Sequence, residues 1–260
     1  MDFPLSVDRV AADGTVKHIV SWSGGKDSSA MLIRMVETGM HIDDIVFIEV
    51  MATPTLGAEL PEMYEYMERM ERYIGRKITV VRSELDFETA FHQPYRSGAR
   101  AGTIYGFPFT VGAWCNDRLK LRTIRRHYKT YGEHIRYLGL AADEPKRIAR
   151  LEPVCRAPLA EWGMAERDCV DFLEKREMMN PLYRKFKRLG CWFCVKQGLN
   201  SLRVLRRDYP EYWAMLLAWD KESPRTFKPN CTVTDLEHRF SLEDRQIHLF
   251  TSLETQQRAA

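Results

Sequence analysis

The sequence predicts an α/β protein with a doubly wound, mainly parallel sheet and a mostly helical C-terminal region. Short apolar runs alternate with amphipathic helices along the first half, which is typical of a parallel sheet covered by helices. A glycine turn joins the first run to the first helix, and ligands bind at such strand ends in these folds. Because residue character changes near 150, we expect an α/β domain over 1–150 and a mainly helical region over 151–260.

Each element of the first half has its own local signals. The first helix ends near Glu37, before Gly39, and a second helix opens at Pro61 and closes at Gly75. The methionines along that second helix share one face and are interpreted as core filling. The expected strands are His18–Val20, Asp43–Val50, Lys77–Arg82 and Ile135–Ala141.

Between the third and fourth strands lies Ser97–Gly112, which is rich in glycine and aromatic residues. Its composition suits a long substrate loop or lid, and it equally suits a variable surface excursion. Beyond residue 150, Pro153, Pro158 and Pro181 punctuate mainly helical pieces, and Tyr209 precedes a further helix.

Composition sets limits on function. The chain has 260 residues and a net charge of +3, so a claim of nucleic-acid binding must rest on where basic residues gather. No apolar run approaches a membrane span, and residues 1–5 carry no secretory signal, so the expected location is cytoplasmic, without membrane attachment. The six cysteines are then expected to be thiols, metal ligands or catalytic groups instead of disulfides.

The strongest motif is the glycine turn Ser21–Ser29, with the sequence SWSGGKDSS. Adjacent Gly24 and Gly25 allow a sharp turn and a close approach of the backbone to a ligand. Unpaired N–H groups at the following helix start attract phosphate, and Lys26 adds a positive charge. The turn is predicted to be a phosphate-binding loop, although it lacks the spacing of a Walker A motif.

Acidic and basic residues follow the fourth strand in the run GLAADEPKR. Asp143 and Glu144 would lie on the ligand edge of the sheet, where they could hold Mg²⁺ or a ribose hydroxyl. Arg147 could bind phosphate or sulfate through two hydrogen bonds. An ordinary turn with surface charges is the alternative interpretation.

Cysteines form a third constellation. The two-residue spacer between Cys191 and Cys194 lets both sulfurs reach one metal ion or cluster, or form a redox disulfide, and a pair without special role stays open. Upstream, Cys115 precedes a cationic helix, and taken alone it also suits a buried cysteine beside a solvated basic face.

Residues 180–207 contain eight lysines and arginines and no acidic residue. Four aromatic residues are interleaved with them, and this mixture suits a polyanion with bases that can stack. It equally suits a small nucleotide, a negatively charged cluster or a solvated basic face. The aromatic residues are Tyr183, Phe186, Trp192 and Phe193.

The segment Ser23–Ser28 resembles the pyrophosphate loop (PP-loop) of the N-type ATP pyrophosphatases, in the adenine nucleotide alpha hydrolase-like superfamily. Over about residues 17–220 the chain resembles the phosphoadenosine phosphosulfate (PAPS) reductase family. The resemblance implies substrate contacts from Arg118, Lys120 and the Asp143–Arg147 turn. It also makes Cys115 the third ligand beside Cys191 and Cys194, for a 4Fe–4S cluster or Zn²⁺, with Cys155 a weaker fourth candidate. The implied nucleotide-binding residues are Ser21, Ser23, Gly24, Gly25, Lys26, Asp27 and Ser28.

Two departures from the family guide the choice of reaction. The chain ends without the C-terminal cysteine of thioredoxin-dependent PAPS reductases, and Trp114 stands where cluster-containing relatives carry a second cysteine. The intact loop is what ATP-splitting members retain. We therefore expect an enzyme that converts ATP·Mg²⁺ to AMP and pyrophosphate, with Lys26 and Asp27 in catalytic roles, and adenylates a substrate for sulfur transfer.

The expected partners are an adenine nucleotide, a tRNA or other nucleic-acid substrate, and a sulfur or electron donor protein. The alternative enzyme is a sulfonucleotide reductase. A non-catalytic protein that binds nucleotides or nucleic acids is the alternative from another class.

Overall fold

The computed structural model describes residues 16–258, with side chains placed as far as residue 246. The chain divides into two compact units. The first takes the described residues up to Asp86 and then Asp117–Cys191, and the second takes Phe87–Asn116 and the residues from Trp192 onward. The boundaries of these units differ from the expected division at residue 150. Residues 151–191 belong to the unit that contains the sheet, and residues 87–116 belong to the unit of the later helices.

The first unit is built on a five-stranded sheet with the strand order β3-β2-β1-β4-β5. All neighbouring strands are parallel, and in the central register Val20 lies beside Ile45 on one side and Tyr137 on the other. This confirms the predicted doubly wound α/β class. The fifth strand was not predicted, because two residues carry no periodic signal. The strands are β1 (Lys17–Ser21), β2 (Asp44–Glu49), β3 (Thr79–Arg82), β4 (His134–Leu138) and β5 (Cys155–Arg156).

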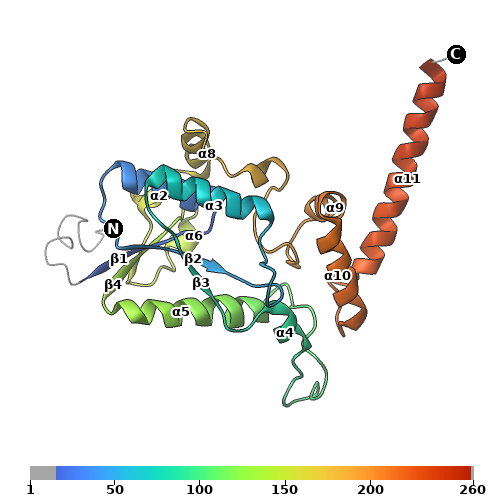
Figure 1. The fold of residues 1–260 in the computed structure, drawn as a ribbon, viewed down its shortest axis with the longest axis horizontal. Helices are drawn as coiled ribbons and strands as arrows, with labels where there is room; N and C mark the ends of the chain where they lie inside the picture. The colour runs from blue at the N-terminus through green and yellow to red at the C-terminus, as the bar shows by residue number, and fades with distance from the viewer. Residues whose placement is uncertain (1–15, 259–260) are drawn as a thin grey trace. The chain divides into compact units, whose positions relative to one another are not determined.

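Helices cover both faces of this sheet (Figure 1). On one face lie α2 (Lys26–Glu37) and α3 (Pro61–Ile74), and α8 (Glu166–Glu174) packs beside α2. On the other face lies α5 (Arg122–Tyr128). The shorter elements of the unit are the π-helix η1 (Asn116–Leu121), η2 (Lys129–Tyr131), α6 (Pro145–Ile148), α7 (Pro158–Glu161) and η3 (Pro181–Arg184).

Local sequence sets the ends of α3, and its buried side chains set how it packs. Pro61 occupies the first turn of α3, and Gly75 ends it in the left-handed conformation with φ of 67°. Met63 and Met70 of α3 are fully buried, which confirms their interpretation as core filling, whereas Met67 is only partly buried. Below the sheet, Tyr128 of α5 packs against Ile19 and Val46 of the strands.

The second unit has a core of stacked aromatic rings. The centroid of Phe87 lies 4.1 Å from that of Phe193 and 5.2 Å from that of Trp219, and Trp192 stacks on Trp219 at 5.4 Å. Such rings bury large apolar areas and account for the cohesion of a unit without a sheet. Its helices are α4 (Phe87–His92), α9 (Leu199–Asp208), α10 (Pro210–Glu222) and α11 (Val233–Arg258).

None of the helices in the described part of the chain is both long and apolar enough to cross a bilayer. Residues 1–5, for which no secretory signal is expected, lie outside the described residues.

We expect Glu237→Gln to destabilise the second unit in a pH-dependent way. Glu237 accepts hydrogen bonds from Arg206 (2.8 Å) and Trp213 (2.6 Å), and Arg206 in particular lowers the pKa of Glu237 to about 2, against the effect of burial. A carboxyl whose pKa is lowered by folding stabilises the fold above its ordinary pKa near 4.5. The variant should lose about 1 kcal/mol of unfolding free energy at pH 7, a modest value because the pair is partly solvated.

Urea unfolding, followed by tryptophan fluorescence at several pH values, measures this effect. The difference from wild type should shrink as the pH falls from 5 toward 2. Glu211→Gln, at an exposed glutamate of α10, is the matched control. A difference that is equally large at pH 3 and pH 7 would contradict the assignment to the ionised carboxylate.

Candidate functional site

The predicted phosphate loop connects the end of β1 at Ser21 to the start of α2 at Lys26. It therefore lies at the carboxyl edge of the sheet, at the N-terminus of a twelve-residue helix. Gly24 has φ of 73°, and an added Cβ would lie 2.3 Å from Sδ of Met63. Buried Asn180 donates a hydrogen bond to the Gly24 carbonyl at 3.0 Å. The hydrogen bond from Asn180 thus fixes the turn, and the positive φ together with the close approach of Met63 requires glycine at position 24.

The end of β4 supports the same loop. A Cβ on Gly139 would lie 2.6 Å from both N and Cα of Ser28, which is backbone of the first turn of α2. Glycine at position 139 is what allows the strand end and the helix start to approach this closely. The helix N-terminus is consequently fixed against the sheet edge.

The loop serines bond to one another. The hydroxyl of Ser28 donates to the Gly25 carbonyl at 3.0 Å and accepts from the Ser23 amide at 3.2 Å. The two serine hydroxyls lie 3.0 Å apart. Within the described residues, the amides of Gly24 and Gly25 have no protein acceptor. The loop therefore presents backbone N–H groups and hydroxyls together, as an anion site requires.

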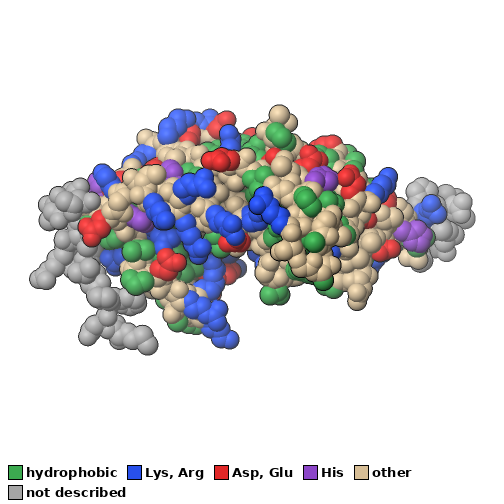
Figure 2. Space-filling view, turned by 90° about the horizontal axis from the view of Figure 1, so that it is seen from below, with side chains coloured by type: hydrophobic (Ala, Val, Ile, Leu, Met, Phe, Trp, Pro, Cys, Tyr) green, Lys and Arg blue, Asp and Glu red, His purple; other side chains and the backbone are tan. Residues whose placement is uncertain are grey.

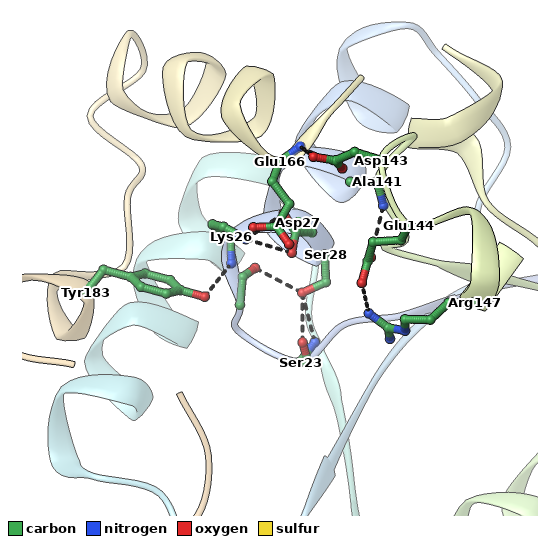
Figure 3. Close-up of polar contacts among 11 residues, drawn as sticks. Ser23, Lys26, Asp27, Ser28, Ala141, Asp143, Glu144, Arg147, Glu166 and Tyr183 are labelled. Carbon is green, nitrogen blue, oxygen red and sulfur yellow. Dashed lines mark hydrogen bonds and ion pairs between the residues drawn. The ribbon is translucent and has the colours of Figure 1, made fainter. Parts of the chain in front are cut away.

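Lys26 supplies the positive charge of the loop (Figure 3). Its Nζ lies 3.0 Å from Asp27 and 2.9 Å from Glu166, and its backbone amide donates to the Tyr183 hydroxyl at 3.1 Å. Burial alone would lower the pKa of Lys26, but the hydrogen bonds to Glu166 and Asp27 outweigh it and raise that pKa. Lys26 thus remains charged throughout the physiological range.

Negative charge gathers around the same lysine. Burial raises the pKa of Asp27, the pairing with Lys26 opposes this rise, and the charges of Glu166 and Glu144 add to it. Lys26 thus lies between two carboxylates in this structure. Phosphate binding at Lys26 and a divalent cation at Asp27 stay predictions.

The turn after β4 lies beside this loop, as the sequence predicts (Figure 3). Asp143 accepts a hydrogen bond from the Glu166 amide at 3.1 Å and so positions the start of α8. Glu144 accepts from the Ala141 amide at 3.3 Å and forms an ion pair with Arg147. Arg147 is thus held by a carboxylate in this structure, and its contact with phosphate stays a prediction.

Arg118 and Lys120 both lie in the π-helix η1. Lys120 faces buried Glu59, whose pKa is raised by burial and drawn down by the charge of Lys120. Arg118 lines a cavity beyond the end of β3, beside Arg82 and Arg122. Their expected role as contacts for the nucleotide substrate stays a prediction.

The expected metal ligands are distributed over both units. Cys191 ends the first unit, whereas Cys115 and Cys194 belong to the second. Among the described residues, no three histidine, cysteine or acidic side chains form a group that could hold a metal ion. Cys155 lies in β5. The cluster or zinc site is therefore still a prediction from the resemblance, and no catalytic step below depends on it.

The basic stretch 180–207 differs from the expected stacking surface. Phe186, Trp192 and Phe193 are at most 4% exposed, so they serve the core and do not offer faces to nucleic-acid bases. Of the alternatives left open for this stretch, base stacking is therefore contradicted for these three residues, because the chain pattern does not separate buried from exposed rings, whereas Tyr183 is partly buried. Several of its arginines are also paired with acidic residues, among them Arg203 with Glu243 at 2.7 Å.

Three loop contacts were not predicted from sequence. Glu166 begins α8, Asn180 precedes η3, and Tyr183 lies within η3, all more than 130 positions from the loop. No spacing in the sequence connects them with Lys26. Only the packing of α8 on α2 and of η3 on α3 brings them to the site.

We expect Glu166→Gln to increase affinity for pyrophosphate. Removing one carboxylate from Lys26 removes a competitor for its charge and a repulsion toward the incoming anion. The gain should be about two- to fivefold, because Glu166 is half exposed and an exposed ion pair contributes about 0.5–1 kcal/mol. Isothermal titration with pyrophosphate measures it, with Asp171→Asn on α8 as the charge-matched control. Unchanged or weaker binding in the variant would show that Glu166 does not compete with the anion.

A family model and two curated relatives match this chain by sequence. The family model described as the phosphoadenosine phosphosulfate reductase domain matches residues 17–197. An uncharacterized protein of Methanocaldococcus jannaschii is 26% identical over 208 residues, which cover 75% of this chain and 39% of the relative. An uncharacterized nin region protein of Escherichia phage lambda is 25% identical over 210 residues, which cover 74% of this chain and 70% of that protein.

The chain thus spans well under half of the length of the archaeal relative. Among solved structures, a U34-tRNA thiolase, NcsA, from Methanococcus maripaludis with its 4Fe–4S cluster is similar at a TM-score of 0.42 and 12% identity. That match covers 83% of this chain and 75% of the thiolase.

Proposed function

Because the chain belongs to the phosphoadenosine phosphosulfate reductase family, we propose that it is a nucleotide-binding enzyme that splits ATP into AMP and pyrophosphate. The observation that carries the proposal is the arrangement of Lys26 and the Ser23–Ser28 loop at the N-terminus of α2. Helix amides, serine hydroxyls and a lysine that stays charged are the groups that a pyrophosphate requires. Such donors also stabilise the charge that develops on pyrophosphate as it leaves.

The proposed reaction is an adenylation. An oxygen of the acceptor attacks the α-phosphorus of ATP, the bond from that phosphorus to the bridging oxygen of the β-phosphate breaks, and pyrophosphate leaves with the bond's electron pair. The acceptor oxygen then carries AMP. In a second step, a sulfur nucleophile from a donor protein can attack the carbon that bears this oxygen: the carbon–sulfur bond forms, the carbon–oxygen bond breaks, and AMP leaves with the oxygen and the electron pair. The chain's own residues bind and orient the phosphates, and Lys26 neutralises the leaving group.

The residues at the loop fit a bound Mg²⁺. This ion prefers oxygen ligands and is usually held by one or two carboxylates together with substrate phosphates. The carboxylate of Asp27 lies beside Lys26, and Glu144 is close enough to influence the pKa of Asp27. Asp27 would hold the ion against the nucleotide, and the ion would neutralise phosphate charge.

The fate of ATP labelled in the α-phosphate tests the proposal. The protein is incubated with Mg²⁺, labelled ATP and unfractionated tRNA, and the products are separated by chromatography. Label in AMP, either free or carried on the tRNA as the adenylate, supports the proposal, while labelled ADP would contradict it. A parallel reaction with PAPS and a dithiol tests the other chemistry of the family. Release of sulfite with ATP left intact would assign the chain to sulfonucleotide reduction.

A further inference from the structure

A second basic site lies in the first unit, away from the phosphate loop. A cavity of about 430 Å³ opens between the end of β3 with the turn that follows it and one side of η1 and α5. We name it the α5 groove. Its lining includes four arginines and one acidic residue, namely Arg82, Arg118, Arg122, Arg126 and Glu84. The whole chain has a net charge of only +3, so four arginines around one cavity are a local concentration of positive charge.

The geometry points to a polynucleotide as the ligand, and we propose that the α5 groove binds its backbone phosphates. This inference rests on the proposed function and names the class of acceptor that the adenylating site would serve. The arginines of the groove are positively charged hydrogen-bond donors. The hydroxyls of Ser83, Thr123 and Thr130 add uncharged donors to the same lining. Arginine together with hydroxyl donors is the usual set for contacts to phosphate oxygens.

Two of the four groove arginines, Arg122 and Arg126, are held only by exposed ion pairs, whereas Arg82 bonds the buried carboxylate of Glu49. The side chains of Arg122 and Arg126 are 68% and 77% exposed, and their partners Asp117 and Glu84 are also well exposed. The Arg126–Glu84 pair is 3.2 Å long, with Glu84 91% exposed. Exposed pairs of this kind contribute little, so a phosphate can replace the carboxylate at small cost.

The shape of the basic surface favours a repeating anion over a single phosphate. Arg122 and Arg126 are four residues apart and so share one side of α5, and Arg118 of η1 lines the same groove. Exposed Arg125 and Lys129 extend this surface around α5 outside the groove. Figure 2 views the side on which α5 lies, and lysine and arginine side chains gather there. An open basic surface of this kind suits a chain of phosphates better than one small ion.

The position of the groove fits the delivery of a substrate to the adenylating loop. Arg82 is the last residue of β3, so the groove begins at the carboxyl edge of the same sheet that carries the phosphate loop after β1. Only β2 lies between these two strands, and two strand spacings amount to roughly 10 Å. A polynucleotide held in the groove would therefore have its neighbouring nucleotides within reach of bound ATP.

Fluorescence anisotropy with labelled tRNA, and with a duplex DNA of similar length, tests this inference on the full chain at several NaCl concentrations. The variant is Arg122→Ala with Arg126→Ala. It should bind both probes about tenfold or more weakly than wild type, and with the duplex DNA the slope of log affinity against log salt should fall by about 1.8, at about 0.9 per lost phosphate contact. The control variant, Arg72→Ala with Arg167→Ala, removes the same charge from exposed positions on α3 and α8 and should bind like wild type.

A charge-conserving variant and a competing polyanion serve as further controls. Arg122→Lys with Arg126→Lys keeps the charge and should keep most of the affinity, which separates charge from misfolding. Polyglutamate should not compete at equal charge concentration. The inference is overturned if the alanine pair binds within twofold of wild type with an unchanged salt slope. It is also overturned if wild type binds no polynucleotide, or if polyglutamate competes fully.

Titration of the same samples with pyrophosphate distinguishes the two proposals. The alanine pair should bind pyrophosphate like wild type, since neither arginine contacts the phosphate loop. Intact pyrophosphate binding with lost tRNA binding supports the groove. Intact tRNA binding without any pyrophosphate binding would instead contradict the proposed function.

Discussion

Lys26→Ala is expected to lose at least 90% of the affinity for pyrophosphate and nearly all ATP cleavage. The variant removes the one ammonium that lies within the loop and bonds Asp27 and Glu166. A hydrogen bond to a charged group contributes about 1.5–3 kcal/mol, which corresponds to about a 10- to 150-fold loss of affinity. Losing a group that stabilises the leaving pyrophosphate should lower the cleavage rate by a further factor of about 100 or more.

Titration with pyrophosphate and a single-turnover assay with ATP measure the two losses. Lys175→Ala, at an exposed lysine near the end of α8, is the matched control and should keep both activities. Lys26→Arg keeps the charge and should restore part of the binding without the full rate, because a planar guanidinium places its donors differently. Unchanged cleavage in Lys26→Ala would remove the loop from the reaction.

Gly139→Ala should disturb the site without touching any charged group. The new Cβ would lie 2.6 Å from N and Cα of Ser28, and backbone atoms cannot move aside as a flexible side chain can. The start of α2 must shift, which should cost about 1–3 kcal/mol of unfolding free energy. It should also lower pyrophosphate affinity by about tenfold, because the loop amides and Lys26 move with the helix.

Thermal unfolding and pyrophosphate titration measure these two effects in the same protein. Gly198→Ala is the control, since its Cβ would meet nothing within 4 Å and its backbone does not need glycine. Wild-type affinity in the Gly139 variant would mean that the contact between β4 and α2 does not set the loop geometry.

The main strands and the helices that cover them could be predicted because they leave periodic signals in the chain. Pro61 and Gly75 mark the ends of α3, and the apolar runs mark the four longer strands. β5 could not be predicted because it has two residues and is defined only by its pairing with β4. The grouping of residues 87–116 with the C-terminal helices could not be predicted either, since contacts between distant aromatic rings such as Phe87 and Phe193 leave no local pattern.

The candidate site also has parts that could be predicted from the sequence and parts that could not. The loop and the turn after β4 could be found because their chemistry is concentrated in consecutive residues, and the structure places them side by side. Glu166, Asn180 and Tyr183 reach the loop only through tertiary packing, so no sequence signal identified them. The basic residues of α5 were visible as composition, but their groove beside Arg82 depends on how β3 and α5 meet.

Isotope exchange between pyrophosphate and ATP tests adenylation, the central claim, most directly. Wild-type protein is incubated with Mg²⁺, unlabelled ATP, labelled pyrophosphate and unfractionated tRNA, and the label in ATP is counted. Because the proposed adenylate forms reversibly with release of pyrophosphate, label should enter ATP with wild type and remain at background with Lys26→Ala. No exchange, together with release of sulfite from PAPS by the same preparation, would contradict the account.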